Sequence, residues 1–109
     1  MNRVVLEGRI SRLGELRLTP GGVPLVEFKV AHASEQTENG RERRVECEMD
    51  AIGIGDIGRA VSALGTGAGV RVTGFLARRS TKSEWPVLHA TAVEAAAVPP
   101  PAGQNDRST

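Results

Sequence analysis

Three cations lie close together in the polar segment between residues 78 and 84. Arg78, Arg79 and Lys82 are offset there by a single carboxylate, Glu84, so the segment carries a net charge of +2. Long, flexible cations can follow a phosphate backbone without fixed geometry, which suits contact with a nucleic acid. The alternative is a hairpin tip whose charges serve only solubility. The charge pattern alone leaves both interpretations open.

Trp85 directly follows this basic segment. An aromatic ring beside cations can stack on a nucleic-acid base, which is worth about 1–3 kcal/mol per base. The ring could equally pack on the rim of the domain, because the Trp85-Pro86 pair favours a fixed, extended start to a strand. Aromatic side chains are scarce, with two Phe, one Trp and no Tyr, so few stacking platforms are available.

The remaining cations of interest form two groups, Arg9, Arg12 and Arg17 in one and Arg41, Arg43 and Arg44 in the other. The first group lies around the end of the first predicted strand and the loop that follows. Carboxylates surround the second group: Glu42, Glu46, Glu48 and Asp50. We therefore expect ion pairs across the sheet in the second group. The outward face of residues 44–51 is acidic and repels phosphate, so loops should carry most of any nucleic-acid contact.

No combination of residues predicts catalysis, a metal site or a bound cofactor. His32 and His89 have no Cys or carboxylate partner at ligand spacing, so we expect structural roles for both. The serines lack a nucleophile-elbow pattern, and Gly65, Gly67 and Gly69 follow a helix instead of preceding one, unlike a phosphate-binding loop. We predict that the protein is not an enzyme.

Cys47 is the only cysteine. A single cysteine cannot form an intramolecular disulfide, which suggests a reducing compartment. Its position in the alternating pattern of residues 44–51 predicts an inward, buried and inert thiol. No apolar run approaches the roughly 18 residues that span a bilayer, and the N-terminus lacks a signal-peptide layout. We expect a cytoplasmic protein.

The chain of 109 residues is long enough for one domain with a modest core. Charged residues make up 25% and the net charge is +1, so any affinity for an anionic polymer must come from local clustering of cations. Apolar residues alternate in five segments and predict five strands, near residues 3–10, 26–31, 44–51, 70–76 and 87–93.

A helix is predicted from Asp56 to Leu64, with Asp56 as its cap and Gly65 at its end. Turns are expected at residues 19–22 and at Asn39-Gly40. Gly8 and Gly74 interrupt their strands where a small barrel needs a bend or a bulge.

The predicted order of three strands, a short helix and two strands is that of an all-β, five-stranded OB-fold barrel. Residues 1–95 would form this domain, and the Pro-rich residues 96–109 would form a disordered tail. In this fold the loop of residues 78–84 borders the face that takes oligonucleotides.

Two stretches resemble the N-terminal signature of bacterial single-stranded DNA-binding proteins: Asn2-Arg3-Val4-Val5-Leu6-Glu7-Gly8-Arg9-Ile10, and Leu16 to Pro24 followed by Phe28. Val70-Arg71-Val72-Thr73-Gly74-Phe75-Leu76 looks like the fourth strand of the same group. Within the group, the chain is most similar to the small replication-restart family of primosomal replication protein N (primosomal protein B). Residues 75–80, 87–90 and 46–49 support this similarity, which covers about residues 2–94.

The resemblance implies a homodimer of OB folds that binds single-stranded DNA without regard to sequence. It also implies partnership with the restart helicase (primosomal protein N′) and other primosome proteins. Arg12 and Arg17 fall where the family has basic DNA contacts, and Arg78, Arg79 and Lys82 fall on its basic loop. With Trp85, these residues form the predicted DNA-binding site.

Three positions depart from the family's best-studied members. Those members carry an aromatic residue where Glu46 stands, an aromatic residue where Arg41 stands, and an arginine where Ala33 stands. Fewer stacking groups and an added carboxylate should weaken DNA binding. The alternative function is therefore a protein-interaction adaptor on the same fold, with weak or vestigial affinity for DNA.

Overall fold

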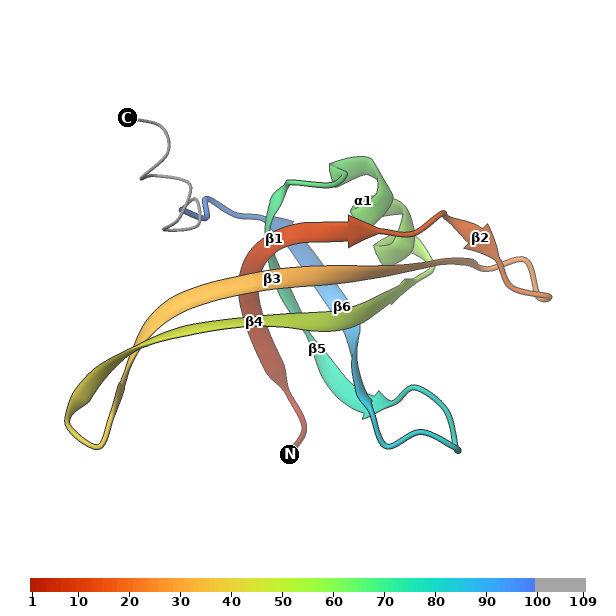
Figure 1. Cartoon of the computed structure of the whole chain (residues 1–109). Coiled ribbons are helices and arrows are strands. Elements are labelled where there is room, and N and C mark those ends of the chain that lie inside the picture. Colours follow the sequence, from red (N-terminus) through yellow and green to blue (C-terminus); the bar gives the residue numbers. More distant parts are fainter. Residues whose placement is uncertain (100–109) are drawn as a thin grey trace.

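The computed structural model describes residues 1–99, which form seven elements of secondary structure (Figure 1). They follow one another as β1 (Val4–Leu13), β2 (Arg17–Leu18), β3 (Pro24–Glu38), β4 (Arg41–Ile54), α1 (Asp56–Leu64), β5 (Gly69–Arg78) and β6 (Pro86–Ala95). The five long strands and the helix between β4 and β5 confirm the predicted OB-fold barrel. The two-residue strand β2 was not predicted.

The long strands close into a barrel because β1 pairs with two partners. The sheet runs in the order β1-β5-β6-β4-β3-β2, and an additional pairing of β1 with β3 completes the ring. β4 and β6 are parallel, and the other paired strands are antiparallel. Nine buried residues form the core: Ile10, Val26, Phe28, Val30, Ala51, Val61, Val70, Val72 and Leu88.

Two glycines make this closure possible, as predicted. β1 pairs with β5 up to Arg9 and with β3 from Arg9 onward, so the strand changes partner beside Gly8. A Cβ at Gly8 would meet the carbonyl oxygen of Ala31. The pairing of β5 with β6 shifts between Thr73 and Gly74, which is the expected bulge.

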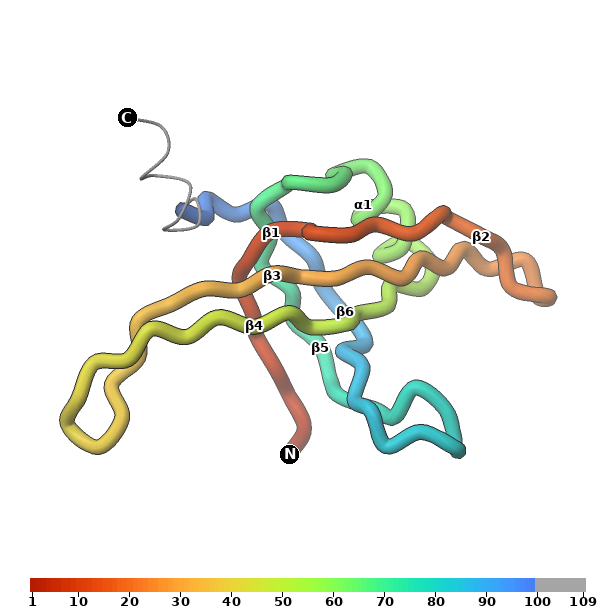
Figure 2. Tube along the Cα trace, viewed as in Figure 1, coloured from red at the N-terminus to blue at the C-terminus, as the bar shows by residue number. Residues whose placement is uncertain are grey.

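The hairpin of β3 and β4 is longer than predicted and projects well beyond the barrel (Figure 2). Its two-residue turn, Asn39-Gly40, has positive φ angles of 52° and 76°, as the sequence predicted. The prediction of a buried thiol was wrong, because Cys47 is exposed. By alternation, Cys47 lies on the same face of β4 as the buried Ala51. At residue 47, however, β4 belongs to the part of the hairpin that projects beyond the barrel, so this face has no cover there.

Helix α1 has the predicted bounds but not the predicted cap. Gly55, with φ 71°, occupies the N-cap position and supplies no side-chain hydrogen bond. Asp56 is the first helical residue, where the positive end of the helix dipole still stabilises a carboxylate. Gly65 ends the helix with φ 83°, as predicted. The buried Val61 joins α1 to the core, and the partly buried Ile57 and Leu64 pack against it.

The chain continues to contact the barrel just after β6. The backbone N–H of Ala96 donates to the carbonyl oxygen of Gly69 over 2.9 Å. Arg9 donates to the carbonyl oxygen of Val98 over 2.6 Å and to that of Gly67 over 3.0 Å. The rest of the predicted tail, residues 100–109, lies outside the described residues.

Candidate nucleic-acid interface

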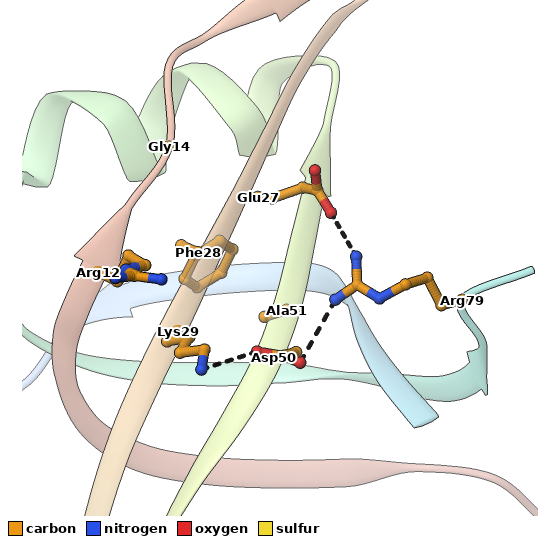
Figure 3. A pocket seen from close by; sticks show the side chains of 8 residues that line it. All are labelled: Arg12, Gly14, Glu27, Phe28, Lys29, Asp50, Ala51 and Arg79. Carbon is orange, nitrogen blue, oxygen red and sulfur yellow. Dashed lines mark hydrogen bonds and ion pairs between the residues drawn. The ribbon is translucent and has the colours of Figure 1, made fainter. Parts of the chain in front are cut away.

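The outward face of β3 and β4 holds an open pocket of about 210 Å³ (Figure 3). Five charged side chains from different parts of the chain line this pocket: Arg12, Glu27, Lys29, Asp50 and Arg79. Gly14, Phe28 and Ala51 complete the lining. The β1–β2 connection and the β5–β6 loop therefore meet at this face, which is the arrangement expected of an OB fold.

The alternation of β3 explains which charges point outward. Val26, Phe28 and Val30 are buried in the core, so Glu27 and Lys29 between them lie on the outer face. Each core residue fixes the direction of its neighbours, since successive side chains of a strand point to opposite faces. The position of Glu27 and Lys29 is thus set by the same packing that closes the barrel.

Four of the charged side chains that line the pocket, together with Arg17 from β2, form what we call the ion-pair chain. Its spatial order is Arg17, Glu27, Arg79, Asp50, Lys29. The two Glu27 oxygens accept from Arg79 over 2.7 Å and from Arg17 over 3.4 Å. The two Asp50 oxygens lie 3.3 Å from Arg79 and 3.8 Å from Lys29. All four carboxylate oxygens therefore face a cation, and the five groups together carry one net positive charge.

Arg79 is the centre of the ion-pair chain. Its hydrogen bond to Glu27 raises the pKa of the guanidinium, with a smaller contribution from Asp50, so this group stays charged at any working pH. Its backbone N–H donates to the carbonyl oxygen of Trp85 over 3.1 Å and closes the β5–β6 loop at its base. Within the loop, the backbone N–H of Lys82 donates to the Ser80 hydroxyl and that of Trp85 donates to the Ser83 hydroxyl.

The five cations among the six predicted DNA-binding residues fall into two groups. Arg17 and Arg79 belong to the ion-pair chain, whereas Arg12, Arg78 and Lys82 form no ion pair with another residue in the range 1–99. Trp85 is 66% exposed, which contradicts a ring packed on the barrel rim and leaves the ring accessible to a base.

Sequence reasoning placed Asp50 on the acidic outward face of residues 44–51, but it did not single out Glu27 and Lys29, and it paired neither carboxylate with Arg79. A signal for Glu27 and Lys29 was present, because charged residues between buried ones on a strand must face outward. The partner of the two carboxylates was not readable from the sequence, since Arg79 lies 52 residues from Glu27 and 29 residues from Asp50.

The projecting part of the β3–β4 hairpin carries its own ion pairs, as predicted. Arg43 lies 3.1 Å from Glu38, and Arg44 lies 3.7 Å from Glu35 and 3.3 Å from Glu46. Glu35 and Glu38 belong to β3, so two of these pairs cross between strands, as expected from the alternating charges. The arginines of the hairpin are thus largely compensated.

The histidines make structural contacts. His32 Nδ1 lies 2.6 Å from the Glu7 carbonyl oxygen, and its Nε2 lies 2.8 Å from the Ser34 hydroxyl. The His89 ring stacks on Phe75 with centroids 5.1 Å apart. Within residues 1–99, no three His, Cys, Asp or Glu side chains are grouped so as to hold a metal ion. No helix of that range is long and apolar enough to cross a membrane.

Comparisons with known proteins agree with this fold. The model of a family described as "Another single-strand binding protein family" matches residues 2–92. The replication restart protein PriB of Nitrosomonas europaea is 40% identical over 88 residues, which cover 81% of this chain and 82% of that relative.

Two solved structures illustrate the similarity of fold. PriB from Ralstonia solanacearum superposes with a TM-score of 0.78 at 27% identity, covering 88% of this chain and 99% of the other. The wild-type single-stranded DNA binding protein from Thermus aquaticus gives a TM-score of 0.70 at 24% identity, covering 89% of this chain and 50% of the other. The second similarity concerns the fold alone.

Proposed function

Because the chain belongs to the single-strand binding protein family and, within it, to the replication restart PriB proteins, we propose that it binds single-stranded DNA without regard to sequence. In this proposal it is an accessory protein of replication restart and acts in the bacterial cytoplasm. It carries out no covalent chemistry itself, and the DNA substrate passes to partner proteins.

The observation that carries the proposal is the position of the uncompensated cations. Arg12 lines the pocket on one side, Arg78 ends β5, and Lys82 lies on the β5–β6 loop that borders the other side. A strand laid across β3 and β4 would meet cations from both loops and could stack a base on the exposed ring of Trp85. Contacts of this kind are independent of base sequence, since every nucleotide has a phosphate and a π-face.

The family also supports a proposal about partners. We expect a homodimer, and we expect the complex to recruit or stimulate the restart helicase and to contact other primosome proteins. An accessory role fits a small barrel whose described residues present binding surfaces and no assembled nucleophile and base.

A second candidate function is a protein-interaction adaptor with weak affinity for DNA. Two observations favour it. Carboxylates already hold Arg17 and Arg79, which lowers the free charge of the face. Leu16, Leu18 and Val23 are large apolar side chains that stay exposed between β1 and β3, where they could contact another protein.

The test is a fluorescence-anisotropy titration with a labelled oligomer of about 30 deoxythymidines, longer than the roughly 4–16 nucleotides that one OB fold covers. We expect micromolar affinity at physiological salt, and a log–log salt slope of about −2 from three phosphate contacts at about 0.7 each. A mixed-sequence strand should bind similarly and a duplex more weakly. Undetectable binding at low salt would favour the adaptor.

A further inference from the structure

The ion-pair chain joins the two loops that border the proposed DNA-binding face. Arg17 comes from β2, Glu27 and Lys29 from β3, Asp50 from β4, and Arg79 from the start of the β5–β6 loop. It therefore crosses the outer face of β3 and β4, from β2 to the β5–β6 loop, where the two loops would hold bound DNA. Its carboxylates occupy positions beside the cations where phosphate oxygens would otherwise lie.

We propose that Glu27 and Asp50 are internal competitors of the DNA backbone, so that they weaken single-stranded DNA binding and reduce its dependence on salt. This inference rests on the proposed function. A phosphate oxygen and a carboxylate oxygen accept the same guanidinium and ammonium donors. Each phosphate that approaches Arg17, Arg79 or Lys29 must displace a carboxylate or share the cation with it.

The exposure of the pairs makes displacement feasible. The side chains of Arg17, Glu27 and Arg79 are 63%, 43% and 45% exposed, and exposed ion pairs are individually weak and screened by salt. The competitor can therefore yield to a polyanion, but its negative charge remains on the face after displacement. That charge repels the phosphate. Because the displaced carboxylate then needs a salt cation of its own, the number of counterions released on binding is smaller.

A positioning role for the carboxylates predicts the opposite effect. If Glu27 served mainly to hold Arg79 in a DNA-binding geometry, its loss would lower the affinity. We infer that the competing role outweighs the positioning role. The guanidinium of Arg79 has five N–H donors and can bind a phosphate without a second anion beside it. Neutralising Glu27 raises the net charge of the ion-pair chain from +1 to +2, since two anions face three cations.

The test compares Glu27→Gln with the wild-type full chain in the anisotropy titration at several salt concentrations. We expect binding about 5- to 25-fold tighter at about 0.1 M salt, and a slope steeper by about 0.7 to 1.4, which corresponds to one or two more phosphate contacts. Asp50→Asn should act in the same direction. Circular dichroism and a thermal melt confirm that each variant is folded.

The matched control is Glu7→Gln. Glu7 pairs with Arg71 over 2.7 Å and is 44% exposed, so it resembles Glu27 in both respects but lies on the β1–β5 side. Equal affinity of Glu27→Gln and wild type, weaker binding by Glu27→Gln, or an equal gain from Glu7→Gln would overturn the inference. Binding by neither wild type nor Glu27→Gln would overturn the proposed function as well.

Discussion

The double substitution Arg78→Ala with Lys82→Ala should remove most of the salt dependence of DNA binding. Three of the predicted contacts, Arg12, Arg78 and Lys82, form no ion pair among the described residues. Two of them belong to the β5–β6 hairpin, Arg78 at the end of β5 and Lys82 in the loop. At about 0.7 per phosphate contact on single strands, the log–log slope should fall from about −2 to about −0.7.

The same number of lost phosphate contacts gives the expected loss of affinity for single-stranded DNA. A slope change of about 1.4 corresponds to roughly 25-fold weaker binding at about 0.1 M salt, relative to binding at 1 M, where counterion release contributes little. Anisotropy titrations of the folded double variant measure both quantities. The barrel should be unaffected, because Arg78 and Lys82 are exposed and contribute nothing to the core.

Arg3→Ala with Arg59→Ala is the matched control. It removes the same charge, and both arginines are exposed, unpaired within residues 1–99 and outside the proposed interface. It should leave the slope near −2. An unchanged slope in the Arg78→Ala, Lys82→Ala variant, or an equal change in the control, would refute the assignment of the loop as the main contact.

Three further predictions concern single residues. Trp85, the only tryptophan and 66% exposed, should show quenched fluorescence when oligo-deoxythymidine stacks on it; unaltered emission at saturation would exclude stacking. Gly8→Ala should destabilise the barrel by about 2–4 kcal/mol in urea unfolding, because its Cβ would press on the Ala31 carbonyl and approach Val30 Cγ1 to 2.7 Å. A loss below about 0.5 kcal/mol would show that β1 relaxes. Cys47 should react with a thiol reagent in the native protein without a lag, since it is exposed; protection until unfolding would contradict the position of the hairpin.

The barrel could be predicted because local patterns agree with its topology. Alternation located the five long strands, Asn39-Gly40 marked the hairpin turn, and Gly8 and Gly74 marked the bends. Each of these signals acts over a few neighbouring residues. The bounds of α1 followed in the same way from the spacing of Ile57, Val61 and Leu64.

Cys47 shows where local pattern fails. Alternation tells which residues share a face, but not where a strand leaves the barrel and loses its cover. The ion pairs of the outer face of β3 and β4 could not be predicted for a related reason. Arg79 reads as a free loop cation until the fold brings Glu27 and Asp50 to it from two other strands. The Lys29–Asp50 pair likewise becomes visible only in the register of β3 with β4, which places the two residues opposite each other.

We propose that single-stranded DNA lies across β3 and β4, between the β1–β2 connection and the β5–β6 loop. Nuclear magnetic resonance of the isotope-labelled protein, titrated with unlabelled oligo-deoxythymidine, tests it most directly. The largest amide shifts should fall in residues 12–18 and 78–85, near Lys29 and Asp50, and at the Trp85 indole. Shifts confined to α1 (Asp56–Leu64) and the β1–β5 side would contradict the claim.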